Sequence, residues 1–222
     1  MTTGKIWIKN LFIICSVLSL NLFSCTLEES NDYNEAFGVV EQFRNGDLYI
    51  RDDAGETLIS TQPISSITTK DSRVWVSYTI ENMNKTNDTL KILPYRVTNI
   101  LSVPLQDASN INEDGIDIWS AWIAQNFLTF DFRIRAKNQD EIKNHEYALV
   151  LQPSNTESDT IFLNFRHDAK GDTKGVLCRT AIAVKLNELT VKRQFKIVAI
   201  TYKDLNGFEQ TIYRTYEDVK KF

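Results

Sequence analysis

The stretch that indicates the fold class most directly is Phe127-Leu128-Thr129-Phe130-Asp131-Phe132-Arg133-Ile134. From its middle onward, apolar and charged residues alternate, with Phe130, Phe132 and Ile134 in one set and Asp131, Arg133 and Arg135 in the other. Successive side chains of a β-strand point to opposite faces of the sheet, so this alternation predicts a strand with one buried and one solvated face.

Further stretches rich in β-branched and aromatic residues follow, separated by polar turns. They cover residues 147–151, 161–165, 176–186, 195–202 and 210–216. Together with 127–134 they predict an all-β unit, most simply a β-sandwich. The preceding segment 119–124 fits either a short helix or an opening strand, because its length does not distinguish the two.

The first half of the chain contains shorter stretches of the same kind. We expect strands over 37–43, 48–51, 57–59, 73–80 and within 89–105. Asn45-Gly46-Asp47 supplies the turn of a hairpin, and Pro94 and Pro104 mark a bend and an end. Five short strands in about seventy residues are typical of a small barrel.

A change of composition separates the two halves. Residues 106–117 are rich in Asp, Asn, Ser, Glu and Gly, which indicates a boundary. We therefore predict a barrel domain over 36–105 and a β-sandwich domain over 106–222. The fold class is all-β, and residues 1–24 and 25–35 precede the folded part as a signal peptide and a flexible tether.

The N-terminus has the anatomy of a bacterial export signal. Lys5 and Lys9 are followed by the apolar run 11–22, which is shorter than the roughly 20 residues of a membrane span. Leu22-Phe23-Ser24-Cys25 then resembles the lipobox of bacterial lipoproteins. The resemblance implies cleavage before Cys25 and attachment of a lipid to its thiol. The alternative is an ordinary secretory signal followed by a chance Cys.

The tether after Cys25 is acidic. Glu28 and Glu29 resemble the export signal that some Gram-negative bacteria place after a lipidated Cys to send a lipoprotein to the cell surface. The alternative is a polar linker that happens to be acidic. We expect an outer-membrane lipoprotein that faces the periplasm or the surface, with Glu28 and Glu29 favouring the surface.

Charge and cysteine usage exclude some classes of protein. Loss of Lys5 and Lys9 with the signal takes the formal net charge from −4 to −6. Affinity for nucleic acid comes largely from Lys and Arg, so this balance argues against such a partner. Once Cys15 is removed and Cys25 is lipidated, Cys178 is the remaining thiol. Its apolar neighbours predict a buried structural residue.

Residues that could carry catalysis occur without their usual spacing. His167 with Asp168 and Asp172 has the residue types of a general base, but also those of a strand end whose acids cap backbone groups. The other His of the chain, His145, completes no metal-binding or nucleophile motif with it. We therefore expect no catalytic site and no enzyme activity.

The sequence also predicts no metal or cofactor. Residues 110–115 imitate the start of a calcium-binding loop, with oxygen-bearing side chains at alternate positions and Gly115 for the turn. Ile118 and Ala121 then stand where further ligands are needed, so an acidic interdomain linker is the better interpretation.

Segments along nearly the whole chain resemble the NigD-like lipoprotein family. They are Gly38-Val39-Val40, residues 47–53 and 73–78 in the first half, and 116–119, 125–130, 144–146 and 165–168 in the second. The resemblance implies an OB-like N-terminal barrel followed by a C-terminal β-sandwich. It implies no established activity. The family name comes from a bacteriocin gene cluster, which suggests a role in immunity.

An OB-like barrel raises the question of ligand stacking. Tyr49, Trp75, Tyr78 and Tyr95 could form aromatic platforms for an oligosaccharide. The favoured alternative is that Trp75 and its alternate neighbours fill the barrel core.

Three hypotheses of function follow. The first is a lipid-anchored, non-enzymatic module that binds a protein or peptide at the envelope, with bacteriocin immunity as one form of it. The second is a glycan-binding accessory lipoprotein of a surface uptake system. The third, and least favoured, is a hydrolase centred on His167.

Overall fold

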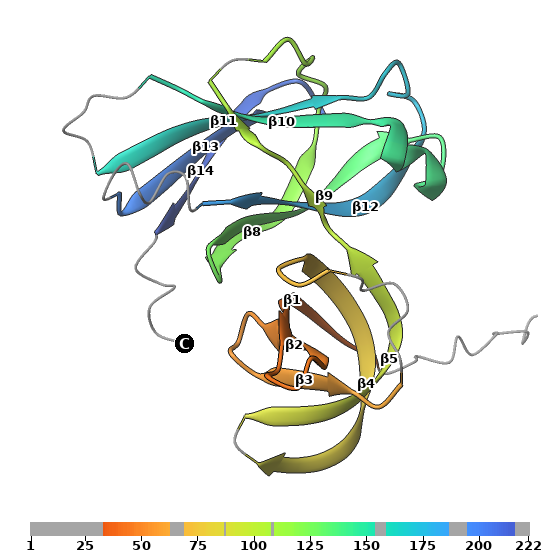
Figure 1. Ribbon diagram of the computed structural model, residues 1–222. Coiled ribbons are helices and arrows are strands. Elements are labelled where there is room, and N and C mark those ends of the chain that lie inside the picture. Colours follow the sequence, from red (N-terminus) through yellow and green to blue (C-terminus); the bar gives the residue numbers. More distant parts are fainter. Residues whose placement is uncertain are drawn as a thin grey trace, which may run out of the picture. The chain divides into compact units, whose positions relative to one another are not determined.

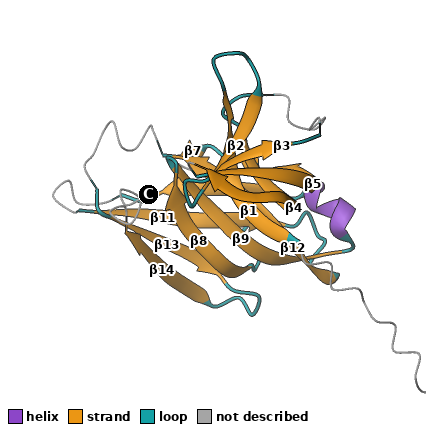
Figure 2. Ribbon diagram, turned by 90° about the horizontal axis from the view of Figure 1, so that it is seen from below, coloured by secondary structure: helices purple, strands orange, loops and turns teal. Residues whose placement is uncertain are grey.

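A computed structural model describes residues 33–62, 69–86, 88–107, 109–153, 159–186 and 195–215 (Figure 1). The predicted signal peptide over 1–24, the lipid-attachment residue Cys25 and the acidic Glu28 and Glu29 lie outside these ranges. Within them, no helix is long and apolar enough to cross a membrane. Figure 2 shows strands in nearly every described segment, with the short 3₁₀-helix η1 (Gln139–Asn144) beside them.

The first half forms the predicted barrel. Its strands are β1 (Asn34–Gln42), β2 (Leu48–Asp52), β3 (Thr57–Ser60), β4 (Arg73–Thr86) and β5 (Thr89–Asn99). They close in the order β1-β2-β3-β5-β4, with β3 and β5 parallel and the other neighbours antiparallel. Alternate side chains point inward and form a core of Val40, Ile50, Leu58, Val74, Val76, Tyr78, Leu90 and Ile92.

Turn residues act in the barrel as their types predict. Gly46 has a φ of +96° in the β1–β2 hairpin, a conformation that residues with a Cβ avoid. In the same turn the Asn45 side chain donates to the Asp47 carboxylate at 2.7 Å. Pro94 stands opposite Tyr78, where the β4–β5 ladder shifts register, so its missing N–H falls at an existing irregularity.

The second half forms two sheets, as predicted for a β-sandwich. Its strands are β6 (Leu101–Ser102), β7 (Leu105–Gln106), β8 (Asp117–Ala124), β9 (Phe127–Ala136), β10 (Glu146–Leu151), β11 (Thr160–Asp168), β12 (Val176–Lys185), β13 (Ile197–Lys203) and β14 (Glu209–Thr215). One sheet has the order β14-β13-β11-β10-β7 and the other β6-β12-β9-β8. The all-β fold class is therefore confirmed.

The alternation in 127–134 sets the two faces of β9. Phe130, Phe132 and Ile134 are fully buried in the large sandwich core. Asp131 instead accepts hydrogen bonds from Arg179 of β12 on the other face. The segment 119–124 is a strand rather than a helix, because it lies within β8 and pairs with β9 along its length.

The sheet membership changes between Asn99 and Leu101. The short β6 and β7 pair with sandwich strands β12 and β10, so residues 101–105 belong to the two sheets of the sandwich. The division into domains at 105/106 stays a prediction, and the strand pairing moves to the sandwich a few residues earlier. β1 begins at Asn34, so the last residues of the predicted tether pair in the barrel.

The interpretation of Trp75 as a barrel-core residue is wrong. Val74, Val76 and Tyr78 of β4 are the inward residues, and the period of two places Trp75 on the outer face. There it packs with Phe37 against a separate apolar cluster that includes Phe127 and Ala183 of the sandwich.

Candidate functional site

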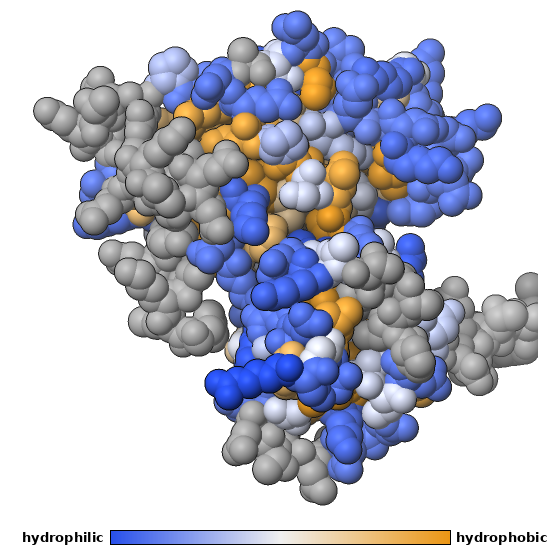
Figure 3. Space-filling view, viewed as in Figure 1, coloured by the Kyte–Doolittle hydropathy of each residue, from blue (hydrophilic) through white to orange (hydrophobic). Residues whose placement is uncertain are grey.

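The outer face of the barrel contacts the four-stranded sheet of the sandwich. Val39, Ile100, Phe127, Ala181 and Ala183 form a buried cluster there, and Phe37 and Trp75 pack against it. The space-filling view in Figure 3 shows hydrophobic residues exposed in the middle of the sandwich, with hydrophilic residues around them.

A buried ion pair within the barrel is hydrogen-bonded to the sandwich. Arg73 of β4 is 3% exposed and donates to both carboxylate oxygens of Asp53, one of them at 2.5 Å. Arg73 also donates to the hydroxyl of Thr129 at 3.1 Å, and the indole N–H of Trp122 donates to Asp53 at 2.6 Å. Because Thr129 and Trp122 lie on β9 and β8, these bonds fix barrel residues against the sandwich.

A cleft with a volume of about 590 Å³ opens beside this contact. Barrel strands β4 and β5, helix η1, β10 and β12 all contribute to it. The polar and aromatic side chains that line it include Trp75, Arg96, Lys143, His145, Tyr147 and Arg179. A volume of this size suits a small organic ligand or a few residues of a peptide.

The charge of the cleft is positive. Arg96 and Lys143 are exposed, and neither forms an ion pair with any residue that the structure describes. Arg179 is already neutralised, since it donates to Asp131 at 3.0 and 2.8 Å and lies 3.3 Å from Glu35. The hydrogen bond to Asp131 raises the pKa of Arg179. None of the described residues that line the cleft is Asp or Glu.

Three lining residues carry buried polar atoms without a hydrogen-bond partner in the described chain. They are the indole N–H of Trp75, Nε2 of His145 and the hydroxyl of Tyr147. Burial alone raises the pKa of the Tyr147 hydroxyl, so it stays a donor over the whole physiological range. Unpaired buried polar groups each cost about 1–3 kcal/mol, so they are rare in native proteins and call for an explanation.

The two histidines of the chain meet behind this cleft. Nδ1 of His145 lies 2.9 Å from Nε2 of His167, and the rings stack with centroids 5.1 Å apart. The exposed fractions are 5% and 2%. Burial first, and then the neighbouring His145, lower the pKa of His167 to about 4. The lowered pKa keeps His167 neutral at physiological pH, so its ring can share one hydrogen bond with His145.

The sequence analysis treated His145 and His167 separately, because they are 22 positions apart. β10 and β11 form an antiparallel pair in which Tyr147 faces His167, so His145 arrives one position beyond the end of the ladder. The signal that could have found the pair is the placement of the two His at matching ends of two adjacent predicted strands.

The acidic residues near His167 accept hydrogen bonds from backbone amides. Asp168 accepts from the amide of Lys170 at 2.8 Å, and that hydrogen bond lowers its pKa. Asp172 accepts from the amide of Lys137 at 2.6 Å and lies 3.7 Å from Nε2 of His145. This is the arrangement expected of acids that cap a strand end.

The calcium-like segment 110–115 makes ion pairs and caps. Glu113 pairs with Arg166 and Lys203, and the bond from Lys203 lowers its pKa. The Asp114 carboxylate accepts from the amide of Ala169 at 2.8 Å. Among the described residues, no group of three or more His, Cys, Asp or Glu is arranged to hold a metal ion.

The interpretation of Cys178 as a buried residue is confirmed. It is 5% exposed within the sandwich core, and burial raises the pKa of its thiol. A raised pKa disfavours the reactive thiolate, which agrees with a structural role.

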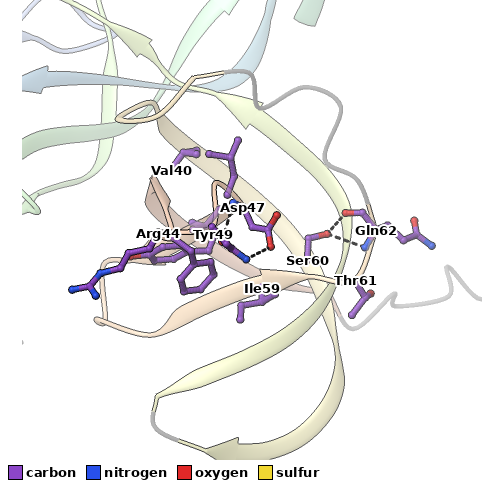
Figure 4. A pocket seen from close by; sticks show the side chains of 12 residues that line it. Val40, Arg44, Asp47, Tyr49, Ile59, Ser60, Thr61 and Gln62 are labelled. Carbon is purple, nitrogen blue, oxygen red and sulfur yellow. Dashed lines mark hydrogen bonds between the residues drawn. The ribbon is translucent and has the colours of Figure 1, made fainter.

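A second hollow lies at the end of the barrel (Figure 4). It has a volume of about 930 Å³ and includes Val40, Tyr49 and Ile59 in its lining. Tyr49 stacks on Phe43 with centroids 4.2 Å apart. None of the lining residues has a buried polar atom without a partner, so this hollow makes the weaker candidate.

The four aromatic residues considered as stacking platforms do not come together. Tyr78 is buried in the barrel core, Tyr49 lines the barrel hollow and Trp75 lines the cleft. Tyr95 is 71% exposed elsewhere on β5.

A small closed barrel followed by a two-sheet sandwich defines a two-part all-β protein. The NigD-like C-terminal beta sandwich domain matches residues 98–216. The chain belongs to the NigD-like family, as its sequence segments suggest. No curated protein matches it.

Solved structures from species of Bacteroides are similar to this chain. A protein of unknown function from Bacteroides vulgatus ATCC 8482 aligns with a TM-score of 0.67 and 19% identity, covering 86% of this chain and 95% of its own. A NigD-like immunity protein from Bacteroides caccae ATCC 43185 aligns with a TM-score of 0.64 and 18% identity, and the alignment covers 82% of this chain and 92% of that protein. A candidate lipoprotein from Bacteroides fragilis NCTC 9343 aligns with a TM-score of 0.63 and 17% identity, and the alignment covers 82% of this chain and 98% of that protein. At these identities the likeness establishes the fold.

Proposed function

We propose that this protein is a lipid-anchored, non-enzymatic binding module of the cell envelope, and that it holds its ligand in the cleft between barrel and sandwich. The observation that carries the proposal is the lining of that cleft. It combines Arg96 and Lys143, which form no ion pair with any described residue, with buried polar atoms that have no hydrogen-bond partner in the described chain, such as the Trp75 indole N–H. Such groups favour a ligand that supplies oxygen acceptors.

The position of the histidines supports binding rather than hydrolysis. A general base must come within hydrogen-bond reach of the substrate proton. His167 is 2% exposed, bonds to His145 and stacks on Tyr147 with centroids 5.4 Å apart. These contacts leave its ring no route to a substrate, and the lowered pKa makes it a weak base.

The envelope location rests on the N-terminal sequence and on a neighbour. Leu22-Phe23-Ser24-Cys25 has the form of a lipobox, and one structural neighbour is a candidate lipoprotein. Another neighbour is an immunity protein. Bacteriocin immunity is therefore the particular binding role that we place first.

A glycan-binding accessory role is the second candidate. Trp119 of β8 is 53% exposed, and the guanidinium of Arg133 lies over its ring at 4.6 Å. An exposed indole supported in this way offers a surface on which a sugar ring can stack.

Photo-cross-linking in living cells tests the binding proposal. A benzophenone amino acid is placed at Leu101, an exposed residue of the cleft, and in a matched control at Phe208, which is exposed but lies elsewhere. We expect a protein or peptide adduct at Leu101 and none at Phe208. A carbohydrate adduct supports the second candidate instead. Adducts at neither position contradict binding in the cleft.

A deletion strain tests the immunity role separately. Cells without the gene are challenged with secreted bacteriocin preparations of related strains, and growth inhibition is compared with that of the complemented strain. We expect greater sensitivity after deletion. Equal sensitivity would remove immunity from the proposal and leave the cross-linking result to define the ligand.

A further inference from the structure

We propose that the ligand of the cleft is an acidic peptide segment, and that Arg96 and Lys143 recognise its carboxylates. This inference rests on the proposed function, because it names the ligand class of the same cleft.

The distribution of charge carries the first step. The whole chain has a formal net charge of −4, yet the described lining of the cleft contains three cations and no carboxylate. Arg179 is satisfied by Asp131 and Glu35, which leaves the charges of Arg96 and Lys143 for a ligand. A cleft lined by one sign of charge concentrates ligands of the opposite sign.

The state of the aromatic rings favours a peptide over a sugar. Trp75 stacks on Phe37 with centroids 5.4 Å apart, and the Arg179 guanidinium lies 4.3 Å over the same ring. Tyr147 stacks on His167 and meets Phe132 edge-on at 5.7 Å. Both rings of the cleft are thus covered by protein, whereas recognition of a sugar by stacking needs a free aromatic face.

The remaining walls suit a peptide. Leu101 lines the cleft and is 54% exposed, whereas Ile100, Ile142 and Ile182 of the lining are buried. An aliphatic side chain of a ligand can pack against Leu101 while flanking carboxylates reach the cations. The unpartnered N–H of Trp75 and hydroxyl of Tyr147 are donors that match peptide carbonyl oxygens.

Fluorescence anisotropy with the full-length protein in detergent tests the inference. The probe is a labelled eight-residue peptide of alternating Glu and Leu, compared with its Gln–Leu counterpart and with labelled oligogalacturonate. We expect the Glu–Leu peptide to bind at least tenfold more tightly than either comparison probe. Its affinity should fall as salt is raised from 50 to 500 mM, because exposed cations are screened.

Variants locate the binding. Arg96→Gln with Lys143→Gln should weaken binding of the Glu–Leu peptide at least tenfold. Lys70→Gln with Lys91→Gln, an equal loss of two positive charges at exposed positions outside the cleft, should leave it unchanged. Circular dichroism checks that the variants fold. If the double variant does not fold, the ratio of the affinities of the wild-type protein for the Glu–Leu and Gln–Leu peptides still tests the inference.

Three results would overturn the inference. They are equal binding of the two peptides, binding insensitive to the double variant, and tighter binding of oligogalacturonate. If neither acidic probe binds but Leu101 still cross-links to a partner in cells, the ligand class is wrong while the proposed function stands.

Discussion

At the scale of single residues, His167 shows how the fold changes the chemistry of a side chain. Free imidazole has a pKa near 6.5, and burial beside His145 lowers that of His167 to about 4. Between these two values the unfolded chain binds a proton that the folded chain does not. The stability that the neutral ring supplies is therefore complete above about pH 6.5 and is lost as the pH falls toward 4.

We expect the free energy of unfolding to drop by roughly 2 kcal/mol between pH 7 and pH 5 from this residue. Urea unfolding at intervals of half a pH unit measures the drop, and the interval from pH 7 to 8.5 is the control, where His167 contributes no slope. Because the chain has two His, NMR can follow both imidazoles directly. Titration of His167 near pH 6.5 in the folded protein would contradict the prediction.

Residue-level reasoning worked where the signal is local. The alternation predicted that Phe130 and Phe132 are buried, and the neighbours of Cys178 predicted its burial. The expectation of a solvated opposite face is wrong at Asp131, which is 6% exposed because it pairs with Arg179. It failed at Trp75, because a single aromatic residue on a strand does not reveal which of its two faces points into the barrel.

At the scale of elements, strands from different parts of the chain are tied by a few polar contacts. Asp53, in the turn after β2, is the counterion of Arg73 on β4, whose side chain is 1% exposed. Removing one partner of a buried ion pair leaves an uncompensated charge, which costs about 3–5 kcal/mol.

Asp53→Ala should therefore lower the free energy of unfolding by about 3 kcal/mol or more. Asp117→Ala is the matched control, since its partner Arg133 is 34% exposed and surface pairs contribute about 1 kcal/mol or less. Chemical denaturation of the two variants measures the difference. Similar losses of unfolding free energy in both variants would show that the Arg73–Asp53 pair stabilises the fold no more than an exposed ion pair does.

The sequence analysis did not predict the order in which the strands pair in the sheets. Local patterns predicted most strands and their turns, but not the parallel pairings of β3 with β5 and β11 with β13. Pairing partners are chosen by packing and hydrogen bonding between distant segments, and neither leaves a trace in local periodicity.

At the scale of the whole molecule, the N-terminal sequence predicts that a lipid on Cys25 anchors the folded part to a membrane. We expect Cys25→Ala to release the protein from the membrane fraction, because the lipid chains supply about 0.8 kcal/mol for each buried methylene. Fractionation followed by immunoblotting measures this, with the Cys178→Ala variant as the control that keeps the lipid site. Retention of the Cys25→Ala protein in membranes would instead indicate an uncleaved anchor.

Surface display is a separate expectation from the acidic residues Glu28 and Glu29. Protease added to intact cells should digest the wild-type protein, and Glu28→Ala with Glu29→Ala should protect it. Full protection of the wild type would place it on the periplasmic side.

The sequence by itself determined the all-β class, the barrel followed by a sandwich and the family, because each depends on periodicity, turn chemistry or motifs within a short stretch. It also predicts the lipoprotein signal at the N-terminus. The tertiary structure alone decided that His145 meets His167, that Trp75 leaves the barrel core and that Arg96, Lys143 and Tyr147 line one cleft. These residues lie on different strands and on η1, and their distances depend on how the sheets pair and pack. That packing is a cooperative property of the whole chain, so no local pattern contains it.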